Sequence, residues 1–194
     1  MNISREHLEL LSESFRNIDE TTKEIINLEA ILSLPKGTEH FLSDIHGEYE
    51  AFDHILRNGS GVIKEKLKEV FGNRLPKKEL NLLATIIYYP EEKLNLLKKE
   101  FSTAEYKEYQ KILLLRLLEV TQVAARKYTR SKVRKLLPKD FDYIIEELLY
   151  KMQTRDKEDY YEKILENIIE LGAGDKFIIE LSLSIHKLII DHLH

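Results

Sequence analysis

Residues 41–50 read Phe41-Leu42-Ser43-Asp44-Ile45-His46-Gly47-Glu48-Tyr49-Glu50, a short apolar approach that ends in Asp-x-His-Gly and runs directly into an amphipathic segment. This order predicts a short strand over residues 39–43 that stops at a tight turn. Because residues i and i+2 of an extended chain point to the same side, we expect Asp44 and His46 to reach one cation together. A carboxylate beside an imidazole suits Mn, Fe or Zn better than Ca or Mg. Gly47 lets the backbone turn without a Cβ penalty.

Interpretations other than metal binding stay open for each of these histidines. The Asp-x-His tripeptide also occurs by chance in surface loops. His192 and His194 are likewise two residues apart and can chelate a metal if they are extended, but the frayed end of a helix or the start of a strand explains them as well. His40 and His54 lie near the motif in the sequence and are typical of core residues, or of groups that orient a ligand.

The stretch from Ser43 to Phe52 resembles the first metal motif of the calcineurin-like metallophosphatases. With the following Leu56-Arg57-Asn58-Gly59-Ser60-Gly61 and the long helical run after it, the chain resembles the class 3 fructose-1,6-bisphosphatases of Firmicutes and related bacteria. The resemblance covers essentially the whole chain, which corresponds to the N-terminal part of that family. It implies hydrolysis of the 1-phosphate of fructose 1,6-bisphosphate to give fructose 6-phosphate in gluconeogenesis, with manganese as the metal.

The resemblance also implies roles for individual residues. Asp44 and His46 would hold one ion of a two-metal pair, and Gly47 and Glu48 would support the site. The other metal motifs of the family are Gly-Asp-x-x-Asp-Arg-Gly, Gly-Asn-His and Gly-His-x-His, and the chain offers only near misses to them, at Gly174-Asp175-Lys176-Phe177, Gly72-Asn73-Arg74 and Asp191-His192-Leu193-His194. We therefore expect a truncated or separately encoded N-terminal segment that binds metal weakly, is inactive alone and has the remaining C-terminal chain as its partner.

Composition limits the class of protein. With 194 residues, 43% hydrophobic and 33% charged, and only 7 Gly and 4 Pro, the chain favours one core of long amphipathic helices. A formal net charge of -4 argues against generic nucleic-acid binding, and the absence of Cys excludes disulfides and thiolate chemistry. The charged N-terminus and the lack of a long apolar run predict a cytoplasmic protein without a membrane span.

Helical periodicity extends over most of the remaining sequence. Helices are predicted over residues 4–33 and 62–71, over 77–88, and from Pro90 to Lys99, where Pro suits a first turn. Ser102-Thr103-Ala104-Glu105 is a capping-box pattern that starts a helix to about Tyr128, in which residues 112–118 are apolar nearly all round. Further helices are predicted over residues 141–152 and 159–171 and through the segment after Gly174.

We predict a mainly α-helical fold with one or two short strands: the opening βα part of an α/β metallophosphatase sandwich plus a helical insertion. Residues 1–61 would form the N-terminal helices and the strand-turn-helix with the metal motif. Residues 62–194 would form a helical insertion or cap that leads to the start of a second strand near His194. The alternative function is a non-catalytic helical interaction module, or a remnant or split subunit.

The basic segment 126–135 holds six Lys or Arg residues in ten. A solvated helix end explains it, because cations favour the negative end of the helix dipole. A surface that attracts a sugar phosphate, or less favourably a nucleic-acid backbone, is the alternative.

Overall fold

The computed structural model describes residues 4–34, 41, 43–44, 46–58, 61–149 and 157–190. Within this part of the chain the elements are helices, in the order α1 (Arg5–Ser14), α2 (Ile18–Leu32), α3 (Tyr49–Asn58), α4 (Val62–Phe71), the 3-10 turn η2 (Gly72–Arg74), α5 (Lys77–Tyr88), α6 (Pro90–Glu100), α7 (Thr103–Ala125), α8 (Arg130–Leu136), α9 (Asp142–Leu149), α10 (Glu158–Glu170) and α11 (Gly174–Ile190). The prediction of a mainly helical chain is confirmed.

The strand predicted over residues 39–43 is not formed at Phe41 and Ser43, the two residues of that segment that the structure describes. The physical reason is that a strand needs a neighbouring strand to satisfy its backbone N–H and C=O groups. No other strand occurs among the described residues to provide one, and Phe41 is 91% exposed. The second strand, predicted near His194, lies outside the described residues.

Backbone contacts divide the chain into two units, Met1–Lys36 and Gly37–His194. The first contains α1 and α2, each started by a side-chain cap: Ser4 accepts a hydrogen bond from His7 N and Asn17 accepts one from Glu20 N. No described residue of either helix is buried. These two helices therefore have amphipathic sequences without an apolar core of their own.

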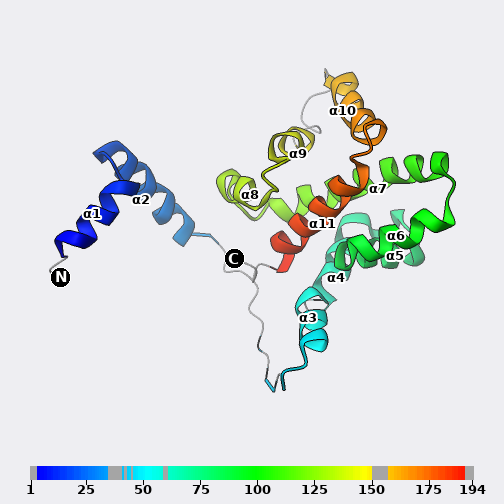
Figure 1. The fold of residues 1–194 in the computed structure, drawn as a ribbon, viewed down its shortest axis with the longest axis horizontal. Helices are drawn as coiled ribbons and strands as arrows, with labels where there is room; N and C mark the ends of the chain where they lie inside the picture. Colours follow the sequence, from blue (N-terminus) through cyan, green and yellow to red (C-terminus); the bar gives the residue numbers. More distant parts are fainter. Residues whose placement is uncertain are drawn as a thin grey trace. The chain divides into compact units, whose positions relative to one another are not determined.

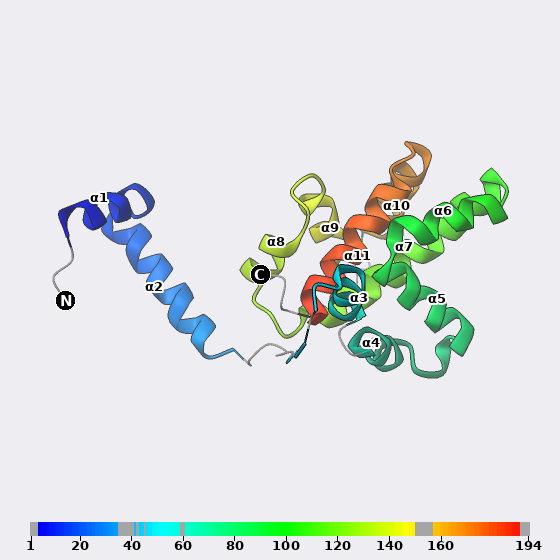
Figure 2. The same cartoon turned by 60° about the horizontal axis from the view of Figure 1, so that its bottom comes forward.

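The second unit is built around the pair α7 and α11 (Figure 1). Figures 1 and 2 show α8, α9 and α10 on one side of this pair and α4, α5 and α6 on the other. The apolar run of residues 112–118 explains why α7 is central, since a helix that is apolar on more than one face must be covered on more than one side. Leu113, Leu114 and Leu117 of α7 and Ile178 and Ile185 of α11 are at most 2% exposed.

Local signals fix the boundaries of these helices. Ser102 and Glu105 form the predicted capping box at the start of α7. Pro90 lies at the start of α6, where its missing N–H costs nothing. None of the helices in the described part of the chain combines the length and the apolar content required to cross a membrane.

Candidate functional site

Asp44 and His46 are brought together by the turn before α3. Nε2 of His46 lies 2.5 Å from Oδ1 of Asp44, and both side chains are 72% exposed. The i, i+2 argument assumed an extended backbone, but the backbone is not extended there. The φ angle is 64° at Asp44 and 50° at His46. Both residues occupy the left-handed region, which is unfavourable for side chains other than Gly. The two side chains thus converge through a turn and not through a strand.

Gly47 completes this turn and leads into α3. Its φ of 73° is accessible at little cost only to Gly, and a Cβ at this position would meet no atom within 4 Å. Gly47 is therefore required by the backbone conformation and not by close packing. The Glu48 carbonyl accepts a hydrogen bond from Phe52 N at 3.0 Å, so the turn is continuous with the first turn of the helix.

A shallow pocket of about 220 Å³ opens beside the motif. It is lined by Ser43, Asp44, His46 and Glu48 from the turn and by Ala51, Phe52 and Ile55 from α3. Polar groups lie on the side of the turn, whereas the helix contributes apolar side chains. The pocket is wide enough to admit a small ligand beside the Asp44–His46 pair.

The described residues contain no group of three or more His, Cys, Asp or Glu side chains that can hold a metal ion together. Asp44 and His46 are a pair of potential ligands and lack a third near them in that part of the chain. His40, His192 and His194 lie outside the described residues. His54 shares a hydrogen bond with the hydroxyl of Tyr89.

Two of the near-miss motifs have structural roles. Asp175 accepts hydrogen bonds from Tyr106 Oη at 2.6 Å and Gln110 Nε2 at 2.7 Å, and it forms an ion pair with Lys98. Burial disfavours the charged form of Asp175, but these partners outweigh burial and hold the pKa of the carboxyl below its usual value. Arg74, in η2, forms an ion pair with Glu119 of α7. Neither position provides a free metal ligand.

The predicted basic segment is divided between the turn after α7, residues 126–129, and the helix α8. Lys127 and Lys132 place their ammonium groups 4.9 and 4.7 Å from the centroid of the Tyr128 ring, whose hydroxyl donates to Leu188 O. Arg134 forms an ion pair with Glu146 of α9. Several of these cations thus contact groups of the protein itself. This favours the interpretation of the basic segment as a helix end over that of a surface for anionic ligands.

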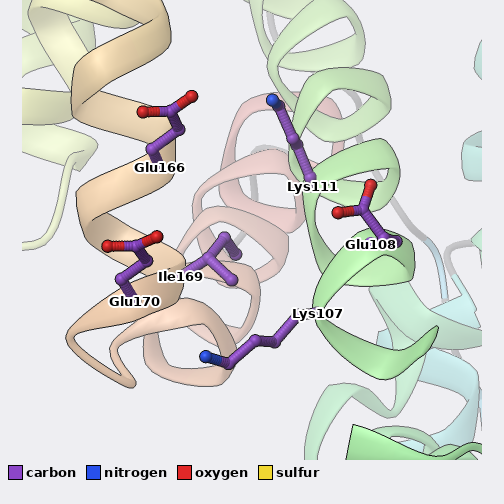
Figure 3. A pocket seen from close by; sticks show the side chains of 6 residues that line it. All are labelled: Lys107, Glu108, Lys111, Glu166, Ile169 and Glu170. Atoms are coloured by element: carbon purple, nitrogen blue, oxygen red, sulfur yellow. The ribbon is translucent and has the colours of Figure 1, made fainter. Parts of the chain in front are cut away.

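A second polar pocket, of about 210 Å³, lies between α7 and α10. Figure 3 shows Lys107 and Lys111 on one wall, Glu166 and Glu170 on the other, and Ile169 between them. Among the described residues, no ion pair within 4 Å joins the two walls. The opposite charges make this pocket a poor match for a polyanionic ligand, because the carboxylates repel what the lysines attract.

Comparison with known proteins gives a consistent result. The profile described as Firmicute fructose-1,6-bisphosphatase matches residues 6–194. The class 3 fructose-1,6-bisphosphatase of Alkaliphilus metalliredigens is 58% identical over 189 residues, which are 97% of this chain and 28% of that protein. Those of Listeria monocytogenes serotype 4b and Clostridioides difficile are 54% and 50% identical, over 99% and 100% of this chain and 29% of each relative. The chain thus spans less than a third of the length of these relatives. No solved structure matches.

Proposed function

The chain belongs to the Firmicute fructose-1,6-bisphosphatase family, and from this premise we propose that it supplies Asp44 and His46 as metal ligands for the hydrolysis of fructose 1,6-bisphosphate to fructose 6-phosphate and phosphate. The observation that carries the proposal is the convergence of the two side chains in a left-handed turn at the start of α3. Such a backbone costs of order 1–3 kcal/mol at each non-glycine residue, and conformations of this kind concentrate at functional sites.

The donor set of this pair fits a transition metal. A carboxylate oxygen and an imidazole nitrogen suit Mn, Fe or Zn, and we propose Mn²⁺ as the ion. A bound pair of such ions would lower the pKa of a water molecule and neutralise phosphate oxygens during in-line attack. Described residues supply only these two ligands in proximity, so we propose that binding to this part of the chain is weak and that further ligands come from the remaining C-terminal region of the family.

The residues of the turn have separate tasks in this proposal. Asp44 and His46 hold the cation, and Gly47 permits the backbone that brings them together. Glu48 directly precedes α3 and lines the pocket at its polar side. The sugar bisphosphate would enter from the open side, because both ligand side chains are largely exposed.

The proposed architecture follows from the same family membership. We propose that residues 39–43 become the first strand of an α/β sandwich when the rest of that sheet is present, with residues 1–61 as the opening portion and 62–194 as a helical insertion. A cytoplasmic location and a role in gluconeogenesis are likewise part of the proposal.

A second candidate function is a non-catalytic helical interaction module. The observation that favours it is the exposure of apolar side chains on α1 and α2, of which Ile18 is 82% and Leu32 is 85% exposed. A partner that buries this surface would stabilise the helices by about 25 cal/mol per Å² of apolar area removed from water.

The enzymatic proposal is tested by complementation. Phosphate release from fructose 1,6-bisphosphate is measured with Mn²⁺ for this chain alone and for this chain mixed with the complementary region of the Alkaliphilus relative. Asp44→Asn and His46→Ala remove the ligands, and Asp140→Asn and His7→Ala are matched controls at exposed positions.

Activity is expected only on mixing, and it should fall by at least 100-fold in both ligand variants and in neither control, because an outer-shell change alone typically costs 10–100-fold. Equal activity of the ligand and control variants would reject the assignment of Asp44 and His46. A mixture that forms a stable complex without any activity would favour the interaction module.

A further inference from the structure

The position of the Asp44–His46 pair depends on the position of α3. The turn passes into this helix without a break, since Phe52 N donates to Glu48 O and Tyr49 N lies 3.0 Å from Gly47 O. Yet α3 has no buried residue among its ten. A rotation of α3 would therefore carry the pair with it, and apolar burial does little to prevent such a rotation.

Tyr89 holds one face of α3. Its hydroxyl shares a hydrogen bond with Nδ1 of His54, and the two rings stack with an interplanar angle of 8° and centroids 6.1 Å apart. The guanidinium of Arg57 lies 5.5 Å from the centroid of the same ring. Because residues three apart on a helix share a face, Tyr89 contacts two consecutive turns of α3 at once.

Tyr89 is itself held firmly at the junction of two helices. Its N–H donates to Thr85 O at 2.8 Å and ends α5, and its carbonyl accepts from Lys93 N at 3.1 Å and begins α6. The buried Pro90 follows directly and fixes φ at the start of α6. Tyr89 thus joins α3 to a rigid corner of the helical unit.

His186 of the central helix α11 holds the end of α3. Its Nε2 lies 2.9 Å from the carbonyl oxygen of Arg57, and the side chain is only 6% exposed. A carbonyl can only accept, so Nε2 of His186 carries the hydrogen. Arg57 O is in the last turn of α3, where carbonyls lack a partner within the helix. Figure 2 shows α3 beside the C-terminal end of α11, and His186 belongs to the last turns of that helix.

The contact region between α3, α5 and α11 is loosely filled. A cavity of about 190 Å³ lies there, lined by Asp53, Leu56, Arg57, Ile87, Tyr88, Leu183 and His186. Gaps of this size forfeit the dispersion contacts that would otherwise hold two helices together. The hydrogen bonds and ring contacts of Tyr89 and His186 are therefore restraints on α3, together with a hydrogen bond of 3.4 Å that Arg57 Nη1 donates to Tyr88 O.

We infer that Tyr89 and His186 are positioning residues that fix the Asp44–His46 pair relative to the helical unit. They act through α3 and do not touch the ligands themselves. The inference rests on the proposed function for its significance, since it assigns to the helical insertion the task of holding the first metal ligands in place. Its structural content, the restraint on the pair, can be measured without metal or substrate.

The absence of Cys from the sequence allows a direct measurement. Spin labels are attached at Ser43→Cys, next to Asp44, and at Lys99→Cys on α6. Double electron–electron resonance spectroscopy then gives the distribution of distances between the two labels. Tyr89→Ala and His186→Ala remove the restraints, and His186→Gln retains a donor near the position of Nε2. Tyr143→Ala, at a 64% exposed tyrosine of α9, is the matched control.

The width of the distance distribution should at least double in Tyr89→Ala and His186→Ala and stay unchanged in His186→Gln and Tyr143→Ala. Circular dichroism shows whether each variant retains its helices, and Tyr89→Ala carries the test if His186→Ala does not fold. An unchanged width in folded Tyr89→Ala would overturn the inference. It would also be overturned if His186→Gln were as broad as folded His186→Ala and did not keep the narrow distribution of the unsubstituted chain. A failure of the metal proposal is recognised separately, by equal phosphatase activity of the ligand and control variants.

Discussion

Replacement of Asp175 by Asn should destabilise the helical unit more than replacement of an exposed Asp does. The carboxylate is only 22% exposed and lies in the first turn of α11, where a negative charge also interacts favourably with the helix dipole. Oδ1 accepts from Tyr106 and Gln110 of α7, and the other oxygen pairs with Lys98 of α6. One side chain therefore links three helices.

The magnitude follows from the change in the acceptor. A hydrogen bond to a charged group contributes about 1.5–3 kcal/mol and a neutral one about 0.5–1.5 kcal/mol, so neutralising Asp175 costs roughly 1 kcal/mol at each of its two short bonds. Loss of the Lys98 pair, whose lysine is 49% exposed, adds at most about 1 kcal/mol. We expect Asp175→Asn to lower the free energy of unfolding by roughly 2–3 kcal/mol, or the Tm by about 5–10 °C.

Urea unfolding followed by circular dichroism measures this change for Asp175→Asn, Tyr106→Phe and the double variant. The double-mutant cycle should give a coupling of about 1 kcal/mol between the two residues. Asp140→Asn is the control, because Asp140 forms an exposed ion pair with Lys176 and should cost less than about 0.5 kcal/mol. The reasoning is refuted if Asp175→Asn costs no more than the control or if the effects of the two single changes simply add.

Three further changes test the same structure. Gly174→Ala should cost about 1–3 kcal/mol in urea unfolding, because its Cβ would lie 2.7 Å from Nε2 of the buried Gln110, and a cost near zero would show that this side chain yields freely. Ser102→Ala should cost about 1 kcal/mol through loss of the capping box that starts α7; a helix content and stability equal to the unsubstituted chain would contradict this. Folding lowers the pKa of Asp175, so the contribution of its carboxylate to stability is present above the unfolded pKa of about 4 and is lost as the pH falls through the lower folded value. The free energy of unfolding, measured from pH 6 to pH 2, should therefore decline more steeply in the unsubstituted chain than in Asp175→Asn.

Much of the helical architecture could be predicted because its signals are local. The bounds of α4 and α5 follow from apolar periodicity interrupted by Gly72 and Pro76, and the start of α7 follows from its capping box. The short helix α8 was not foreseen as a separate element. Its seven residues are mostly charged, and the segment is too short for an apolar periodicity to be recognised.

The contacts that hold α3, the helix that follows the candidate site, could not be predicted, because they join residues far apart in the sequence. Tyr89 and His54 are 35 residues apart, and His186 and Arg57 are 129 apart. The Gly174-Asp175 pair looked like part of a metal motif, but its Asp is satisfied by partners on two other helices. The left-handed backbone at Asp44 and His46 was also hidden, because the i, i+2 argument applies to an extended chain and does not foresee a turn with positive φ.

Binding of Mn²⁺ to Asp44 and His46 is the central claim, and paramagnetic broadening of the amide NMR signals tests it most directly. Titration with millimolar Mn²⁺ should broaden the signals of residues 44–48 first, and Asp44→Asn and His46→Ala should each remove this selectivity while Asp140→Asn keeps it. Broadening that is uniform over the acidic surface, or that persists at residues 44–48 in both ligand variants, would contradict the claim.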